Sequence, residues 1–264
     1  MSSKVTRKEF TAAAALHLKY LMQDPAGVQL DFSGRTLPPQ AIPARSLCLR
    51  AALFAACHAP GVDLSGQDLS YSTFSGADFS GAQLFCSNMA HIVAENVNLT
   101  EADICACVFR AAGLVAARLH ACNAPHADFS GAVIHNADFS GAYLRSADFS
   151  CADLRCADLS IINAADAIFP RAGLFGAKLC GAFLSHANLT QATVHDADLR
   201  GACMHGAHLR LASRRGADLR GADLSYADLR GANLSGAKIK GADFSGAIFD
   251  DDEPLADCIT DDHS

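Results

Sequence analysis

Eleven histidines and eleven cysteines are the side chains of this 264-residue chain best suited to hold a metal ion or act as nucleophiles. Their spacing fits neither use. The chain contains no Cys-x-x-Cys pair, no His-Glu-x-x-His motif, no nucleophile elbow and no glycine-rich phosphate loop between a strand and a helix. We therefore expect no catalytic residue, no metal site and no cofactor.

The cysteines indicate the cellular compartment of the protein rather than a catalytic role. Their number is odd and their spacing is scattered, unlike the framework of a disulfide-rich secreted protein. We expect reduced thiols and a cytoplasmic protein, with Cys57, Cys107 and Cys122 acting as small core residues.

The formal net charge of −7 excludes one class of function. A chain that binds nucleic acid by charge alone is normally basic, so direct binding of nucleic acid is not expected. No apolar run reaches the about 18 residues that a membrane span requires.

A period of five residues runs through the chain and must organise its elements. At every fifth position from 49 to 249 there are 41 residues, and 36 of them are Leu, Phe, Ile, Met or Val. The exceptions are Ala59, Ala94, Ala124, Ala164 and Arg214. Two residues earlier, every such position from Ala127 to Ala247 is Ala except Ile162, and the consensus reads A-(D/N)-(L/F)-(S/R)-G. A five-residue period fits neither an amphipathic helix nor an ordinary strand.

Within one unit, Ala and Leu flank Asp and therefore lie on the same side of a short extended segment. A Gly or another turn residue then bends the chain. Repetition of this unit predicts an all-β solenoid, with Ala and Leu inside and Asp, Ser and Arg outside.

The pattern resembles the pentapeptide-repeat family, and the resemblance covers about residues 45–249 without an insertion. It implies a right-handed quadrilateral β-helix with four pentapeptides per coil. About ten coils at a spacing of about 4.8 Å would make a rod roughly 50 Å long. Residues twenty apart should then stack, which predicts an inner ladder of Phe109, Phe129, Phe149 and Phe169.

The N-terminal 24 residues are predicted to form a helical cap over one end of the solenoid. Thr6 to Glu9 has the pattern of a capping box, and Phe10, Ala14, Leu18 and Leu21 share one helical face. An export signal is the alternative. Residues 25–44 are expected to be a linker or an irregular first coil, and residues 250–264 an acidic tail.

Two sets of charged residues are candidate partner surfaces. One is the column of Asp138, Asp158, Asp198 and Asp218, which Lys178 interrupts. Family resemblance implies a function for it, because the quinolone-resistance members are rods whose acidic pattern imitates DNA and binds DNA gyrase. Basic residues in the column and the absence of projecting loops weigh against that transfer. Alternatively, the aspartates only solvate the surface and bond to turns.

The second set is basic and lies in the last repeats. Residues 200–249 carry eight basic and four acidic side chains. The candidates are Arg200, Arg210, Arg214, Arg220, Arg230 and Lys240. Since Arg214 occupies an inward position, we expect a local bulge that turns it outward.

The sequence therefore predicts a non-enzymatic scaffold that binds an unidentified protein through an extended face. A DNA mimic directed at gyrase or topoisomerase and a secreted bacterial effector are the alternatives. We expect a monomer, with a weak dimer as the alternative.

Overall fold

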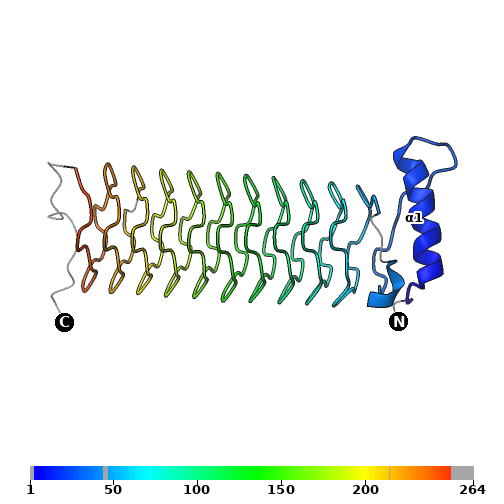
Figure 1. Ribbon diagram of the computed structural model, residues 1–264, viewed down its shortest axis with the longest axis horizontal. Coiled ribbons are helices and arrows are strands. Elements are labelled where there is room, and N and C mark those ends of the chain that lie inside the picture. The colour runs from blue at the N-terminus through cyan, green and yellow to red at the C-terminus, as the bar shows by residue number, and fades with distance from the viewer. Residues whose placement is uncertain (1–2, 44–46, 214, 251–264) are drawn as a thin grey trace.

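The computed structural model describes residues 3–43, 47–213 and 215–250. Most of the chain forms a rod of stacked coils, with a helix at its N-terminal end (Figure 1). From Cys48 to Ile248, the outward residue of each repeat pairs in parallel with the residue twenty positions on. Four pentapeptides therefore complete one coil. The predicted quadrilateral β-helix with an N-terminal helix is confirmed.

The outward residues form four columns, and each column defines one face of the rod. Face 1 runs from Asp68 to Asp228, face 2 from Thr73 to Asn233, face 3 from Asp78 to Lys238, and face 4 from Gln83 to Asp243. Each pair of neighbouring faces meets at a corner, which we name by its two faces. Side chains far apart in the sequence thus become neighbours along a face.

Inward Ala and large apolar residues fill the rod, because strand alternation points both toward the axis. Phe109, Phe129, Phe149 and Phe169 are fully buried. Successive rings are nearly parallel, with centroids 4.9, 4.9 and 5.0 Å apart. The twenty-residue register therefore builds one continuous aromatic stack at the centre of the molecule.

Corners are turned by a residue in the left-handed region, such as Gly131 with φ 64° or Asn136 with φ 60°. The aspartate of the repeat stabilises the turn. For example, the Ser130 N–H donates to Asp128 Oδ1 at 2.9 Å, and the Ser140 N–H donates to Asp138 Oδ1 at the same distance. The outward aspartates therefore have a role in the fold itself.

Helix α1 (Arg7–Leu21) begins with the predicted capping box, in which the Glu9 N–H donates to Thr6 Oγ1 and the Thr6 N–H donates to Glu9 Oε2. The predicted buried face is partly wrong. Phe10 and Ala14 are buried, but Leu18 is 50% exposed and His17 is buried in its place. His17 packs inward because both ring nitrogens find backbone partners there, at Arg50 O and at the Leu30 N–H.

The segment between the helix and the regular repeats also stacks on the rod. Asp31 pairs with Leu53 and Thr36 with His58, so its offset is twenty-two residues instead of twenty. Lys4 pairs in turn with Thr36, and Leu30, Phe32 and Leu37 are buried. A short 3₁₀ helix, η1 (Pro39–Ala41), completes this segment. Two predictions, the bulge at Arg214 and the tail beyond Asp250, lie outside the described residues.

Candidate interaction surface

The structure separates the predicted surface residues into two groups. Asp138, Asp158, Asp198 and Asp218 lie in one column on face 3, together with Lys178. Arg200, Arg220 and Lys240 lie two residues beyond members of this column, on corner 3/4. Arg210 and Arg230 follow the face 1 column instead and occupy corner 1/2, diagonally across the rod. Face 3 with corner 3/4 is therefore the larger continuous surface.

Several corner arginines bind the aspartate that precedes them by two residues. Arg200 Nε and Nη2 lie 2.8 and 2.7 Å from the two carboxylate oxygens of Asp198. Arg220 binds Asp218 in the same way, at 2.8 and 2.6 Å. The Arg hydrogen bonds hold the pKa values of both carboxyls below their ordinary value. Around Asp198 and Asp218, face 3 thus carries fixed, charge-paired side chains.

The middle of the face 3 column has more available carboxylate. Asp158 Oδ2 lies 3.2 Å from Lys178 Nζ, which is the next residue along the column. Asp138 uses Oδ1 to accept hydrogen bonds from the N–H and the hydroxyl of Ser140. Even in the acidic part of face 3, carboxylate oxygens therefore accept hydrogen bonds within their own turns.

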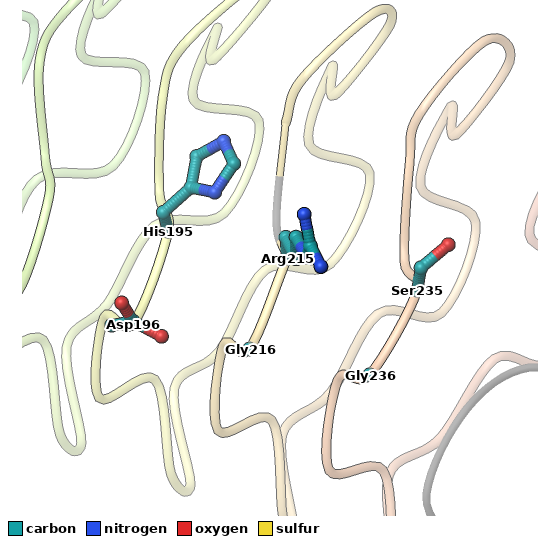
Figure 2. Close-up of a pocket in the computed structure, with 6 residues that line it drawn as sticks. All are labelled: His195, Asp196, Arg215, Gly216, Ser235 and Gly236. Atoms are coloured by element: carbon teal, nitrogen blue, oxygen red, sulfur yellow. The ribbon is translucent and has the colours of Figure 1, made fainter.

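A notch of about 410 Å³ opens at corner 2/3, on the other edge of face 3. Figure 2 shows its lining as a row along the corner: His195, Asp196, Arg215, Gly216, Ser235 and Gly236. The two glycines leave the corner without side chains. A Cβ on Gly216 would lie 2.4 Å from Asp196 Oδ1, so the carboxylate of Asp196 occupies the space above that glycine.

Arg215 differs from the other corner arginines near face 3. The residue two positions before it is Ser213, whose hydroxyl lies 2.6 Å from His195 Nε2. Among the described residues, Arg215 has no carboxylate within salt-bridge distance, whereas Arg200 and Arg220 each have one. Arg215 was not among the residues predicted from the sequence, although Ser213 stands where Arg155, Arg200, Arg220 and Arg230 each have an Asp two residues earlier.

The backbone ladder is stretched at this notch. The Asp196 N–H donates to Arg215 O at 3.2 Å and the Gly216 N–H to Ser235 O at 3.4 Å, against 2.9 Å for the Gly176 N–H and His195 O one coil earlier. Position 214, where the repeat lacks its apolar residue, immediately precedes this corner. The notch therefore lies where the repeat is least regular.

Histidines and cysteines in the described part of the chain form no group of three or more, with or without carboxylates, that could hold a metal ion. Cys57, Cys107 and Cys122 are buried. Burial raises the pKa of Cys57 and Cys107 to about 12 and raises that of Cys122 as well, so these thiols stay protonated. No helix among the described residues is long and apolar enough to span a membrane.

Comparison with known proteins is consistent with this geometry. The family model described as pentapeptide repeats matches in eight copies, over residues 48–84, 112–150, 127–160, 167–206 and 215–251. The structure of HetL from the cyanobacterium Nostoc sp. strain PCC 7120, a pentapeptide repeat protein involved in the regulation of heterocyst differentiation, is similar at 27% identity. That match covers 89% of this chain and 96% of HetL, with a TM-score of 0.66.

Two other solved structures are more distant. QnrB1, a plasmid-mediated fluoroquinolone resistance protein, is 19% identical over 74% of this chain and 91% of its own, with a TM-score of 0.42. Rfr23 from the cyanobacterium Cyanothece 51142 is 26% identical over 52% of this chain and 91% of its own, with a TM-score of 0.28. No curated protein sequence matches the chain.

Proposed function

Because the chain belongs to the pentapeptide-repeat family, we propose that it is a non-enzymatic scaffold that binds a protein partner through face 3. The binding surface is centred on Asp198 and Asp218 and is bordered by corner 3/4 and by the notch at corner 2/3. The observation that carries this proposal is Arg215, a guanidinium that has no carboxylate partner among the described residues and lies beside the ion pairs of Asp198 and Asp218.

Face 3 is suited to binding because its charged groups are already fixed. The bidentate contacts of Arg200 and Arg220 hold long side chains in single positions, which lowers the entropy lost when a partner docks. Arg215 offers donors for an acidic side chain of the partner, and Asp196 offers an acceptor in the same notch. A protein surface with neighbouring charges of both signs is the expected complement.

Affinity purification from the native cell tests this proposal, with the wild-type rod compared with charge-reversed variants. Arg215→Glu is expected to remove the partner that the wild type captures. The matched control is Arg171→Glu, which reverses an arginine on corner 1/2 that contacts Gln191 instead of an acid. A partner that survives Arg215→Glu, or that is lost equally with Arg171→Glu, would show that binding does not use face 3.

A DNA mimic directed at gyrase is the second candidate, and the geometry favours it less. A mimic needs rows of uncompensated carboxylates in place of phosphates. On face 3, Asp198 and Asp218 are neutralised by Arg200 and Arg220. Purified protein should therefore leave gyrase supercoiling unchanged at micromolar concentration, and inhibition at that concentration would reverse the ranking of the two candidates.

The proposed compartment is the reducing cytoplasm. Buried thiols such as Cys57 and Cys107 support it, because they serve as core residues in a chain whose described cysteines are all free. A secreted effector remains the alternative. The packing of α1 against the first coil supports a structural cap, and fusion of residues 1–24 to a reporter would detect an export signal.

A further inference from the structure

Face 4 carries an apolar patch that the binding surface on face 3 does not use. Tyr143 and Phe183 lie in its outward column on either side of Asn163, and their side chains are 39% and 54% exposed. Ile161 lies on the adjoining corner 3/4 and is 67% exposed. Gly141 and Gly181 occupy the equivalent corner positions of the coils before and after it, so no side chain covers Ile161. We call Tyr143, Ile161 and Phe183 the face 4 patch.

Charge is absent from the column around this patch. Between Asp103 and Asp223 the outward residues of face 4 are Asn123, Tyr143, Asn163, Phe183 and Cys203. Ion pairs flank the patch on both sides: Arg145 with Asp166 at 3.2 Å on corner 1/4, and Lys178 with Asp158 at 3.2 Å on face 3. A partner for the patch must therefore present apolar groups on a similarly uncharged surface.

The chemical types of the side chains in this column are symmetric about Asn163. From Asn163 outward in both directions come an aromatic residue, a small polar or thiol residue, and an aspartate. When a second copy of such a surface is rotated by 180° so that the two rods run antiparallel, side chains of the same chemical type face each other. The surface is therefore self-complementary. Such a surface fits a second copy of the same chain.

We propose that two copies pack antiparallel through face 4, about a twofold axis that passes beside Asn163. Tyr143 of one copy then faces Phe183 of the other, and the Ile161 side chains meet across the axis. Aromatic and aliphatic groups at the centre of an uncharged zone are the usual anchors of an interface. The proposal goes beyond the partner-binding function, because it uses a different face.

Charge limits the size and strength of this dimer. Asp103 of each copy would approach Asp223 of the other, so the contact is confined to about five coils, or about 24 Å of rod. Interfaces below about 1,200 Å² are typical of weak association. Each chain carries a formal charge of −7, so general repulsion also opposes pairing. Added salt screens that repulsion and should strengthen the dimer, unlike an association held by ion pairs.

The arrangement has a consequence for face 3. The twofold axis makes the two rods antiparallel, and corner 3/4 of one copy lies against corner 3/4 of the other. Face 3 of both copies is therefore on the same side of the dimer. The dimer would offer one continuous surface twice as wide as that of one rod. A partner could then contact both copies at once.

Sedimentation velocity of the full chain tests the proposal, at concentrations up to about 200 µM so that an interface of micromolar dissociation constant is populated. The wild type is expected to form dimers, and more so at about 0.5 M than at about 0.1 M salt. Phe183→Glu should weaken dimerisation at least tenfold. The matched control is Phe175→Glu, which changes a phenylalanine of similar exposure, 46%, on corner 2/3. Thermal unfolding of both variants would show that each remains folded.

A photo-cross-linking residue in place of Asn163 gives the orientation. Cross-links to residues 143–183 of the second copy are expected for the antiparallel pair. Several results would overturn the proposal: a wild type that stays monomeric at the highest concentration, equal weakening by both variants, or cross-links to another face. Binding of an unrelated protein that Phe183→Glu abolishes, with a monomeric wild type, would also overturn it.

Discussion

Phe149 has neighbours on three sides in the aromatic stack. Its ring is parallel to those of Phe129 and Phe169, and Phe139 meets it edge-on at 5.9 Å. Neighbouring coils are tied by backbone hydrogen bonds, so they cannot collapse into a hole left inside the rod. The contribution of the Phe149 ring to the free energy of unfolding should therefore be near the upper end of the range for core residues.

Phe149→Ala is expected to lower the free energy of unfolding by about 3–5 kcal/mol, measured by chemical denaturation. Phe175→Ala, which truncates an exposed phenylalanine, should cost less than about 1 kcal/mol. A loss below about 1 kcal/mol for Phe149→Ala would contradict the stack as a source of stability.

Asp228 shows how one carboxylate serves both the turn and an ion pair. Its Oδ1 accepts from the Arg230 N–H, while Arg230 Nε and Nη2 bind its two oxygens at 2.9 and 2.6 Å. Arg230 holds the pKa of this carboxyl below its ordinary value of 3.8. A lowered pKa stabilises the fold fully above pH 3.8, and that contribution is lost as the pH falls further.

Asp228→Asn keeps the turn acceptor and removes the ion pair. It should lower the free energy of unfolding by about 1 kcal/mol at neutral pH, and the difference from wild type should disappear as the pH falls below 3.8. Denaturation from neutral pH to below that value measures it. Asp148→Asn is the control and should show the smaller pH dependence, because among the described residues the Asp148 carboxylate bonds to Ser150 and to no arginine. Equal behaviour of the two variants would rule out the ion pair as the cause.

These Asp–Arg ion pairs could not be predicted from the sequence at the level of individual side chains. The period of five predicted which residues point inward, because burial requires the same position in every repeat. The family resemblance, which implies four repeats per coil, predicted which of them stack. The sequence pattern marked Arg200 and Arg220 as candidate surface residues but did not predict that each binds an aspartate. The bidentate contact across the corner depends on turn geometry and side-chain rotamers, which the pattern does not contain.

Helix α1 covers one end of the rod through His17. The Leu30 N–H donates to Nδ1 at 3.0 Å and Nε2 donates to Arg50 O at 2.8 Å, so the ring must be neutral. Sequence analysis placed Leu18 on the buried face, since apolarity was the only guide. The actual face is set by the irregular first coil, which was one of the two expectations for residues 25–44. Its twenty-two-residue offset, however, cannot be read from the sequence pattern.

His17 should make the cap sensitive to pH. Burial lowers the pKa of its imidazole from the ordinary 6.5, so the folded cap disfavours protonation. Its stabilising contribution is complete above pH 6.5 and declines as the pH falls below that value. The protection factor of the Leu30 amide against hydrogen exchange, which corrects for the slower chemical exchange in acid, should therefore fall on acidification.

His17→Ala tests this effect directly. The variant should show a lower protection factor at the Leu30 amide at every pH, and that protection factor should no longer fall below pH 6.5. His91→Ala, which removes a histidine on corner 1/2 that stacks on Tyr71, is the control and should keep the dependence. An unchanged pH profile in His17→Ala would assign the effect to other groups.

For the whole molecule, the uninterrupted twenty-residue register means that the faces keep their identity along the rod. Deletion of residues 111–130 removes one coil and leaves every later residue on its own face. Deletion of residues 111–115 turns the later part of the rod by one face. Asp138 would then follow the column of face 2 instead of face 3.

Distances between spin labels at positions 98 and 198, both on face 3, distinguish the two deletions. The twenty-residue deletion should shorten the distance by about 5 Å, one coil spacing. The five-residue deletion should lengthen it, because the second label moves to the neighbouring face. Shortening in both variants would show that the coils can shift register without turning the rod.

The same register has a genetic meaning. A duplication or loss of the codons for one whole coil alters only the length of the protein and preserves each surface, so selection on binding should tolerate it. A gain or loss of the codons for a single pentapeptide keeps the reading frame and the core. It nevertheless moves every later residue to the neighbouring face, so that each binding surface is divided between two faces. Within a lineage that keeps its partner, changes in gene length should therefore accumulate in units of whole coils.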